Sequence, residues 1–141
     1  MRCQAPEYGV AMPEGERFEQ RAAAVIDALQ RRGAIFAYLH GSRAAGTGKP
    51  DSDMDVAAYF DGHPPAAFEL LLPPEVDLLV LNQAPLELAG RVAVNGKLLF
   101  ERDASARVAW EATTRKIYFD ELPRMTRAHK EFAETVLRRG R

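Results

Sequence analysis

The first apolar pattern along the chain repeats with the period of an α-helix. We expect this helix to begin at Pro13, with Glu14 and Glu16 in its first turn, and to end after Arg32 at Gly33. The apolar positions with helical spacing are Phe18, Ala22, Val25, Ile26 and Leu29. They form one stripe, which is typical of a helix packed against a core.

Four short apolar segments predict strands. They are Ala34 to Leu39, Asp53 to Phe60, Val76 to Leu81 and Lys97 to Glu101. The third is nearly continuous in apolar residues, so we expect it to be covered on both faces. The proline-bracketed stretch before it has room for at most a short helix, Ala66 to Leu72.

The last half of the chain predicts further helices. One begins at Pro85 and ends at Asn95-Gly96, and another begins behind Asp103 as N-cap and runs towards Pro123. A final helix has Met125, Ala128, Phe132, Val136 and Leu137 on one face. The pattern predicts an α/β (α+β) fold: a small mixed sheet of about four strands flanked by helices, with two C-terminal helices. We expect residues 1–141 to form a single domain.

Composition and charge narrow the function classes. The chain is 47% hydrophobic and 28% charged, as in ordinary globular domains, and Cys3 is its one cysteine. An internal disulfide and a cysteine-based zinc site are therefore excluded. The net charge of −1 argues against tight nucleic-acid binding. No apolar run approaches the roughly 18 residues of a membrane helix, and residues 1–12 lack a signal-peptide core, so we expect a cytoplasmic protein.

Candidate chemistry begins with two aspartates at the head of the second strand. Asp53 and Asp55 point to the same face because side chains alternate along a strand. Two neighbouring carboxylates repel each other unless a cation lies between them, and Mg²⁺ is the hard cation that suits oxygen ligands. The competing interpretation is a solvated turn pair, since Asp51-Ser52-Asp53 also has turn composition.

A second feature lies at the end of the preceding strand. Gly41 lets the backbone approach a bulky anion, and Ser42 can cap a helix whose N–H groups face phosphate oxygens. Arg43 and Lys49 are candidate phosphate contacts or, equally, plain surface charges. His40 adjoins Gly41, although ordinary packing is the simpler interpretation of this histidine, and no histidine has metal-ligand spacing.

A third acid lies on the next strand. Asp77 completes a cluster with Asp53 and Asp55 if the third strand pairs beside the second. Two metal ions about 3.5–4 Å apart would then clamp the attacking and leaving oxygens of a phosphoryl transfer. Glu75 competes for this role, and we favour Asp77 because an unpaired carboxylate within an apolar run is costly. The alternative for Asp77 is an exposed strand-edge acid.

Gly41-Ser42, ten intervening residues, Asp53-Met54-Asp55 and a later Asp77 form a pattern that resembles the DNA polymerase β-like nucleotidyltransferase superfamily. Within it, the chain looks most like the minimal nucleotidyltransferases of the MntA antitoxin family. The segments that carry this likeness are Gly41 to Ala44, Val76 to Asn82, Gly96 to Asp103 and Tyr118 to Pro123. Departures are the short proline-rich stretch after the second strand and Lys49 at a position more often small or neutral.

The resemblance implies a specific activity. MntA-like proteins pair with a HEPN-domain toxin, HepT, and silence it by moving AMP from ATP to a tyrosine hydroxyl. On this basis Asp53 and Asp55 bind Mg²⁺, and Asp77 shares a metal ion and helps to deprotonate the tyrosine. Ser42 and nearby backbone groups then hold the triphosphate.

Two other functions stay open. One is a small-molecule nucleotidyltransferase of the aminoglycoside-modifying kind, although little chain remains after Glu101 for an acceptor domain. The other is a non-catalytic antitoxin that masks its partner, which would not need three converging carboxylates. We expect Trp110 and Phe119 in the core. A cluster of basic residues is either a solvated face or a docking surface for an acidic partner or ATP phosphates: Arg124, Arg127, Lys130, Arg138, Arg139 and Arg141.

Overall fold

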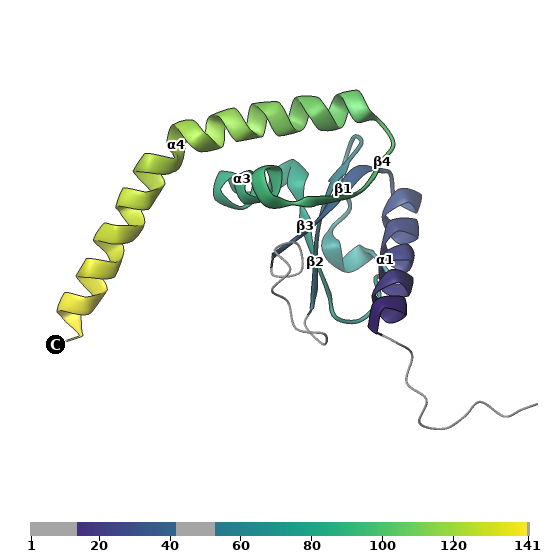
Figure 1. The fold of residues 1–141 in the computed structure, drawn as a ribbon, viewed down its shortest axis with the longest axis horizontal. Helices are drawn as coiled ribbons and strands as arrows, with labels where there is room; N and C mark the ends of the chain where they lie inside the picture. Colours follow the sequence, from purple (N-terminus) through teal and green to yellow (C-terminus); the bar gives the residue numbers. More distant parts are fainter. Residues whose placement is uncertain (1–13, 42–52, 141) are drawn as a thin grey trace, which may run out of the picture.

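A computed structural model describes residues 14–41 and 53–140, and its centre is a four-stranded mixed sheet (Figure 1). The strands are β1 (Ala34–His40), β2 (Met54–Phe60), β3 (Val76–Val80) and β4 (Lys97–Glu101). Their order across the sheet is β3-β2-β1-β4. β1 runs antiparallel to both β2 and β4, whereas β2 and β3 are parallel. The mixed sheet flanked by helices confirms the fold class predicted from the sequence.

One face of the sheet packs against α1 (Glu14–Arg31). Val25 and Leu29 of this helix are fully buried, as the helical stripe predicted. They join the strand residues whose side chains point to this face, which are Ala37, Leu39, Met54, Val56, Ala58 and Phe60. The core on this side therefore takes every second residue of β2, as the two-residue period of a strand requires.

The opposite face is covered by α3 (Leu86–Asn95) and by the first part of α4 (Ala104–Arg139) (Figure 1). Its core cluster is Phe36, Tyr38, Ala57, Leu81 and Val92, and Trp110 of α4 packs on it. The indole ring lies 5.6 Å from the rings of both Phe36 and Tyr38, so the expected core role of Trp110 is confirmed. Asp55 lies two residues before Ala57, and Asp77 lies two residues before Leu79. Both aspartates therefore point to this same face.

β3 departs from the sequence prediction. It lies at the edge of the sheet, and none of its five residues is fully buried. Leu78 packs on the core beneath α1 and Leu79 on the core of the other face, so the expected cover on both faces is present but partial. The short helix expected before it is a single 3₁₀ turn, η1 (Ala67–Glu69). After β3, η2 (Leu81–Gln83) carries Asn82, whose side-chain amide bonds both the N–H and the C=O of Phe60 at 2.9 and 2.8 Å. This amide clamp fixes the end of β2 against the chain after β3.

The C-terminal region is one helix and not the two that were predicted. α4 runs 36 residues from its N-cap Asp103, whose carboxylate accepts a hydrogen bond from the Ala106 N–H at 3.0 Å, and it contains Pro123. A proline inside a helix removes one hydrogen bond and bends the helix without always ending it. Figure 1 shows the resulting two arms, which we call the first arm (104–122) and the second arm (123–139). No described helix has the length and apolar character needed to cross a membrane.

Polar contacts fix the first arm to the sheet and to α3. The Tyr38 hydroxyl donates to the Glu111 carboxylate at 2.7 Å, and burial together with this carboxylate raises the pKa of Tyr38. Arg107 donates to Glu101 at 2.6 Å, and Arg115 donates to the Ala93 carbonyl at 2.6 Å. Phe119, by contrast, is 53% exposed, so its predicted core position is wrong. It lies on the outward side of the arm while its neighbour Tyr118 faces α3.

The contact between α3 and α4 depends on a glycine. A Cβ atom at Gly90 would collide with the ring and the Cβ of Tyr118, which cannot move without the helix. We expect Gly90→Ala to lower the free energy of unfolding by about 1–3 kcal/mol through overpacking. Gly15→Ala in α1, where a Cβ meets nothing within 4 Å, is the matched control and should raise stability by up to about 1 kcal/mol. Urea denaturation measures both, and equal effects of the two substitutions would contradict this packing.

Candidate active site at the acidic end of the sheet

Two carboxylates meet at one end of the sheet because of strand register. Asp55 of β2 is the direct register partner of Asp77 of the parallel strand β3. Adjacent strands lie about 4.8 Å apart, so residues in register on one face have neighbouring side chains. Asp55 is half-buried and Asp77 is exposed. The sequence predicted the cluster of acids only if β3 paired beside β2, and this pairing is present.

Asp53 lies immediately before β2, two residues from Asp55, and is exposed. The backbone beside it is fixed, since the Met54 N–H donates to the Glu75 carbonyl at 2.8 Å. The three aspartates thus occupy one end of two neighbouring strands. Among the residues that the structure describes, however, no three Asp, Glu, His or Cys side chains stand close enough together to hold a metal ion by themselves.

Glu75, the rival acid, is engaged elsewhere. Its carboxylate pairs with Arg21 of α1 at 3.4 Å, and α1 packs on the opposite face of the sheet. Its backbone has a φ of 65°, which reverses the chain just before β3. Glu75 is therefore directed away from Asp55, and Asp77 is the acid that the register places beside it.

Gly41 directly follows β1 and lies against Asp55. Its φ is +73°, a left-handed conformation that favours glycine, and a Cβ atom there would collide with the Asp55 carboxylate. The backbone of residue 41 thus lies directly against the Asp55 side chain. Ser42, Arg43 and Lys49, the other predicted nucleotide-binding residues, lie outside the described residues.

His40 lies beside Asp55, whereas the sequence predicted no position for it beyond its adjacency to Gly41. It is the register partner of Asp55 on β1 and is half-buried. Burial lowers its pKa, against the opposing effects of the Asp55 charge and of a hydrogen bond with the Val56 backbone. Its Nε2 atom is buried with no hydrogen-bond partner in the described structure. The sequence signal for this residue was only its adjacency to Gly41.

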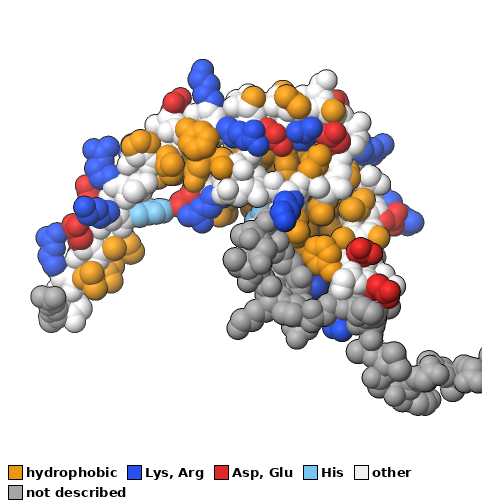
Figure 2. Space-filling model, viewed as in Figure 1, with side chains coloured by type: hydrophobic (Ala, Val, Ile, Leu, Met, Phe, Trp, Pro, Cys, Tyr) orange, Lys and Arg blue, Asp and Glu red, His pale blue; other side chains and the backbone are white. Residues whose placement is uncertain are grey.

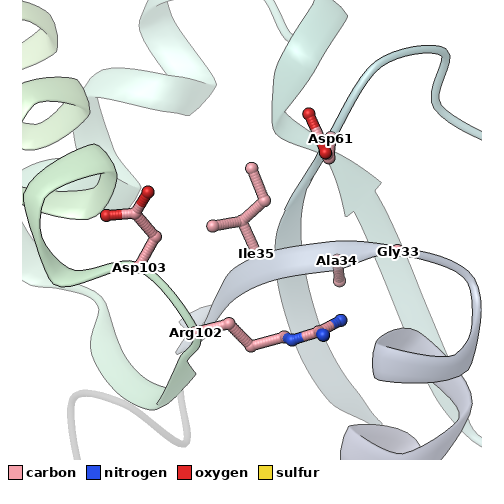
Figure 3. A pocket seen from close by; sticks show the side chains of 6 residues that line it. All are labelled: Gly33, Ala34, Ile35, Asp61, Arg102 and Asp103. Carbon is pink, nitrogen blue, oxygen red and sulfur yellow. The ribbon is translucent and has the colours of Figure 1, made fainter.

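A cavity of about 340 Å³ lies at the opposite end of the sheet, where β1 begins. Figure 3 shows Asp61 and Asp103 on either side of Ile35, with Arg102 extended beneath Ala34. Since His40 ends the strand that Ala34 begins, this cavity is separated from the three aspartates by the length of β1. It is not part of the acidic end.

The sequence and geometry together define the class of protein. A profile of the family described as polymerase beta, nucleotidyltransferase matches residues 24–105, which is more than half of the chain and includes Gly41 and all three aspartates. The chain therefore belongs to the polymerase beta nucleotidyltransferase family. A search of curated proteins finds no match.

Solved toxin–antitoxin structures share the fold. A toxin–antitoxin structure with AMP-PNP is 21% identical, with a TM-score of 0.63, over 79% of this chain and 98% of that chain. A MntA complex in which two aspartates two positions apart are replaced by glutamate is 18% identical, with a TM-score of 0.61, over 86% of this chain and 99% of that chain. A complex of a tri-AMPylated Shewanella oneidensis HEPN toxin with an MNT antitoxin is also 18% identical, with a TM-score of 0.59, over 81% and 98% of the two chains.

The close approach of Gly41 to Asp55 generates a prediction about metal affinity. In Gly41→Ala the new methyl group turns the Asp55 carboxylate aside, so binding of Mn²⁺ in the presence of a non-hydrolysable ATP analogue should weaken by roughly 10–100-fold. Gly62→Ala is the control, because Gly62 also has a left-handed φ, +66°, but a Cβ there meets nothing within 4 Å.

Both substitutions should cost about 1–3 kcal/mol of stability through backbone strain. Calorimetric titration of Mn²⁺ separates the two effects. Equal loss of affinity in both variants, or unchanged affinity in Gly41→Ala, would show that Asp55 is not a metal ligand.

Proposed function

We propose that this protein is an antitoxin that transfers AMP from ATP to a tyrosine hydroxyl of a HEPN-domain toxin. The observation that carries the proposal is the register pairing of Asp55 with Asp77 beside the glycine backbone at residue 41. Nothing in the packing of the sheet requires two neighbouring carboxylates at this end. Their mutual repulsion is relieved by a divalent cation.

The donor set fits magnesium. Asp53, Asp55 and Asp77 offer hard carboxylate oxygens, and the described structure offers no soft ligand beside them. Mg²⁺ usually takes one or two carboxylates and completes its octahedron with water and substrate phosphate oxygens. This explains how a site without a preformed cage of three side chains serves a nucleotide-dependent enzyme. When bound, the metal would supply positive charge that stabilises the phosphate oxygens during transfer.

The protein residues then have separate roles. Asp53 and Asp55 hold the metal-bound triphosphate, and backbone N–H groups from Gly41 onwards orient it, with Ser42, Arg43 and Lys49 as additional contacts. Asp77 accepts the proton of the tyrosine hydroxyl. The phenolic oxygen forms a bond to the α-phosphorus, the bond from that phosphorus to the bridging oxygen breaks, and pyrophosphate leaves. His40, whose pKa is lowered by burial, lies beside Asp55 on the adjacent strand.

The choice of nucleotide and acceptor draws on the structural neighbours. One of them contains AMP-PNP, and another contains a HEPN toxin that carries three AMP groups. The two aspartates altered in the MntA complex are two positions apart, as Asp53 and Asp55 are here. The matched chains are covered over 98–99% of their length, so the present fold includes nearly all of what those chains contain.

The direct test uses the chain, radiolabelled ATP, Mg²⁺ and a HEPN-domain toxin as the acceptor. We expect label on the HEPN protein, lost by at least about 10³-fold in Asp53→Asn plus Asp55→Asn because the site no longer holds the cation that neutralises the triphosphate charge. Asp61→Asn is the control, since Asp61 lies at the other end of β2. Label on added aminoglycosides and not on the protein would instead assign a small-molecule enzyme. Neutralisation of the toxin without label, equal in the double variant, would assign a masking antitoxin.

A second prediction separates the two acids of β3. Asp77→Asn should reduce the rate of AMP transfer by roughly 10²–10⁴-fold, the contribution of a general base. Glu75→Gln should leave the rate close to that of the wild type, because Glu75 is paired with Arg21 and losing that surface pair costs at most about 1 kcal/mol of stability. Single-turnover kinetics measures both, and the reverse order would reassign the base to Glu75.

A further inference from the structure

The face of α4 that contacts α3 in the first arm continues along the second arm. Tyr118 of the first arm packs on Gly90 of α3, and His129 of the second arm reaches Glu87 in the first turn of α3, with Nε2 and Oε2 3.4 Å apart. Phe132 and Val136 follow at helical spacing on this same side. We call Met125, Phe132 and Val136 the arm stripe. The arm stripe extends the α3-contacting face of α4 past the first turn of α3.

The arm stripe is uncovered beyond His129. Phe132 is 72% exposed and Val136 is 51% exposed, and Leu137 beside them is 70% exposed. Figure 2 shows hydrophobic side chains along the inner edge of the second arm, turned towards the body, and Lys and Arg along its outer edge. An aromatic ring and two aliphatic side chains left in water at the end of a projecting helix are typical of a protein-binding surface.

The charge around the arm stripe indicates the occupant. From Pro123 to Gly140 the chain has five Lys and Arg residues and two Glu residues, although the whole chain has a net charge of −1. A symmetric pairing of two arm stripes would place like charges side by side, which opposes a second copy as the occupant. A different protein, with an apolar helix face bordered by carboxylates, complements both the stripe and its charge.

The second arm also lies on the relevant side of the molecule. α4 covers the same face of the sheet to which Asp55 and Asp77 point. The arm projects from the body on that side, with the stripe facing inward (Figures 1 and 2). A protein held on the stripe is therefore on the side of the sheet from which the acids are reached.

We infer that the arm stripe is the docking surface for the acceptor protein, which binds it through an acidic-bordered apolar helix. This inference rests on the proposed function for the identity of the acceptor. It assigns to the second arm the task of holding the acceptor while the acidic end modifies it. Binding through the arm stripe requires neither ATP nor metal.

The test measures binding of the full chain to the same HEPN-domain toxin by calorimetry, without nucleotide. Phe132→Ala plus Val136→Ala should raise the Kd by at least about 100-fold, because these are the exposed apolar side chains of the stripe. Val108→Ala is the matched control, since Val108 is on the same helix, is 53% exposed and lies away from the stripe. Its Kd should equal that of the wild type. Helix content, measured by circular dichroism, should be the same in all variants, since alanine favours helix.

Two further results bear on the inference. Raising the salt concentration from 50 to 500 mM should weaken binding of the wild type several-fold, as expected for basic residues facing carboxylates. AMP transfer by the Phe132→Ala plus Val136→Ala variant should show a higher KM for the HEPN protein at nearly unchanged kcat. A lower kcat at unchanged KM would overturn a docking role.

The outcomes are distinguishable from those of the proposed function. Unchanged Kd in the double alanine variant, with AMP transfer intact, overturns the arm stripe and leaves the activity standing. Stripe-dependent binding without AMP transfer supports the stripe and overturns the activity. Absence of binding to the HEPN protein overturns both. A dimer of the chain alone, or binding to anionic vesicles, that is lost in the same double variant also overturns the inference, because the occupant would be a second copy or a membrane.

Discussion

The parallel pairing of β2 with β3 places Asp55 beside Asp77, and the rest of the molecule supports this pairing. Two carboxylates side by side destabilise a sheet by their repulsion, so the fold must hold them by other means. The apolar residues that follow Asp55 on β2 and Asp77 on β3 hold the strands in place. They pack against α1 on one face of the sheet and against α3 and α4 on the other. The Asn82 amide, bonded to both backbone groups of Phe60, fixes the far end of β2.

The arrangement of side chains at the acidic end follows from the backbone conformation at two positions. Gly41 allows the chain after β1 to lie against Asp55, a position that any side chain would disturb. Glu75 turns the chain before β3 and pairs with Arg21, so a third acid does not compete with Asp77. Together these features place Asp55 and Asp77 side by side at one end of the sheet, with the backbone of Gly41 against Asp55. This arrangement suits a metal–triphosphate complex, whose phosphate oxygens complete the metal's ligand shell.

Much of this could be read from the sequence, because periodicity carries the information. The helix of residues 14–31 and the four strands follow from spacing of 3.6 or 2 residues. The edge position of β3 did not follow, since an apolar run does not reveal whether its strand is central or at an edge. The continuity of α4 did not follow either, because Pro123 is compatible with a bend as well as with an end. The position of His40 beside Asp55 did not follow, because strand register is not written in the sequence.

We propose that Asp55 and Asp77 share a divalent cation with a nucleoside triphosphate. Crystals of the protein grown with Mn²⁺ and a non-hydrolysable ATP analogue test this by anomalous scattering. We expect an anomalous peak within coordinating distance of oxygens of both carboxylates and of the triphosphate, about 2.0–2.3 Å from each. A bound nucleotide whose Mn²⁺ peak lies away from these two side chains would contradict it.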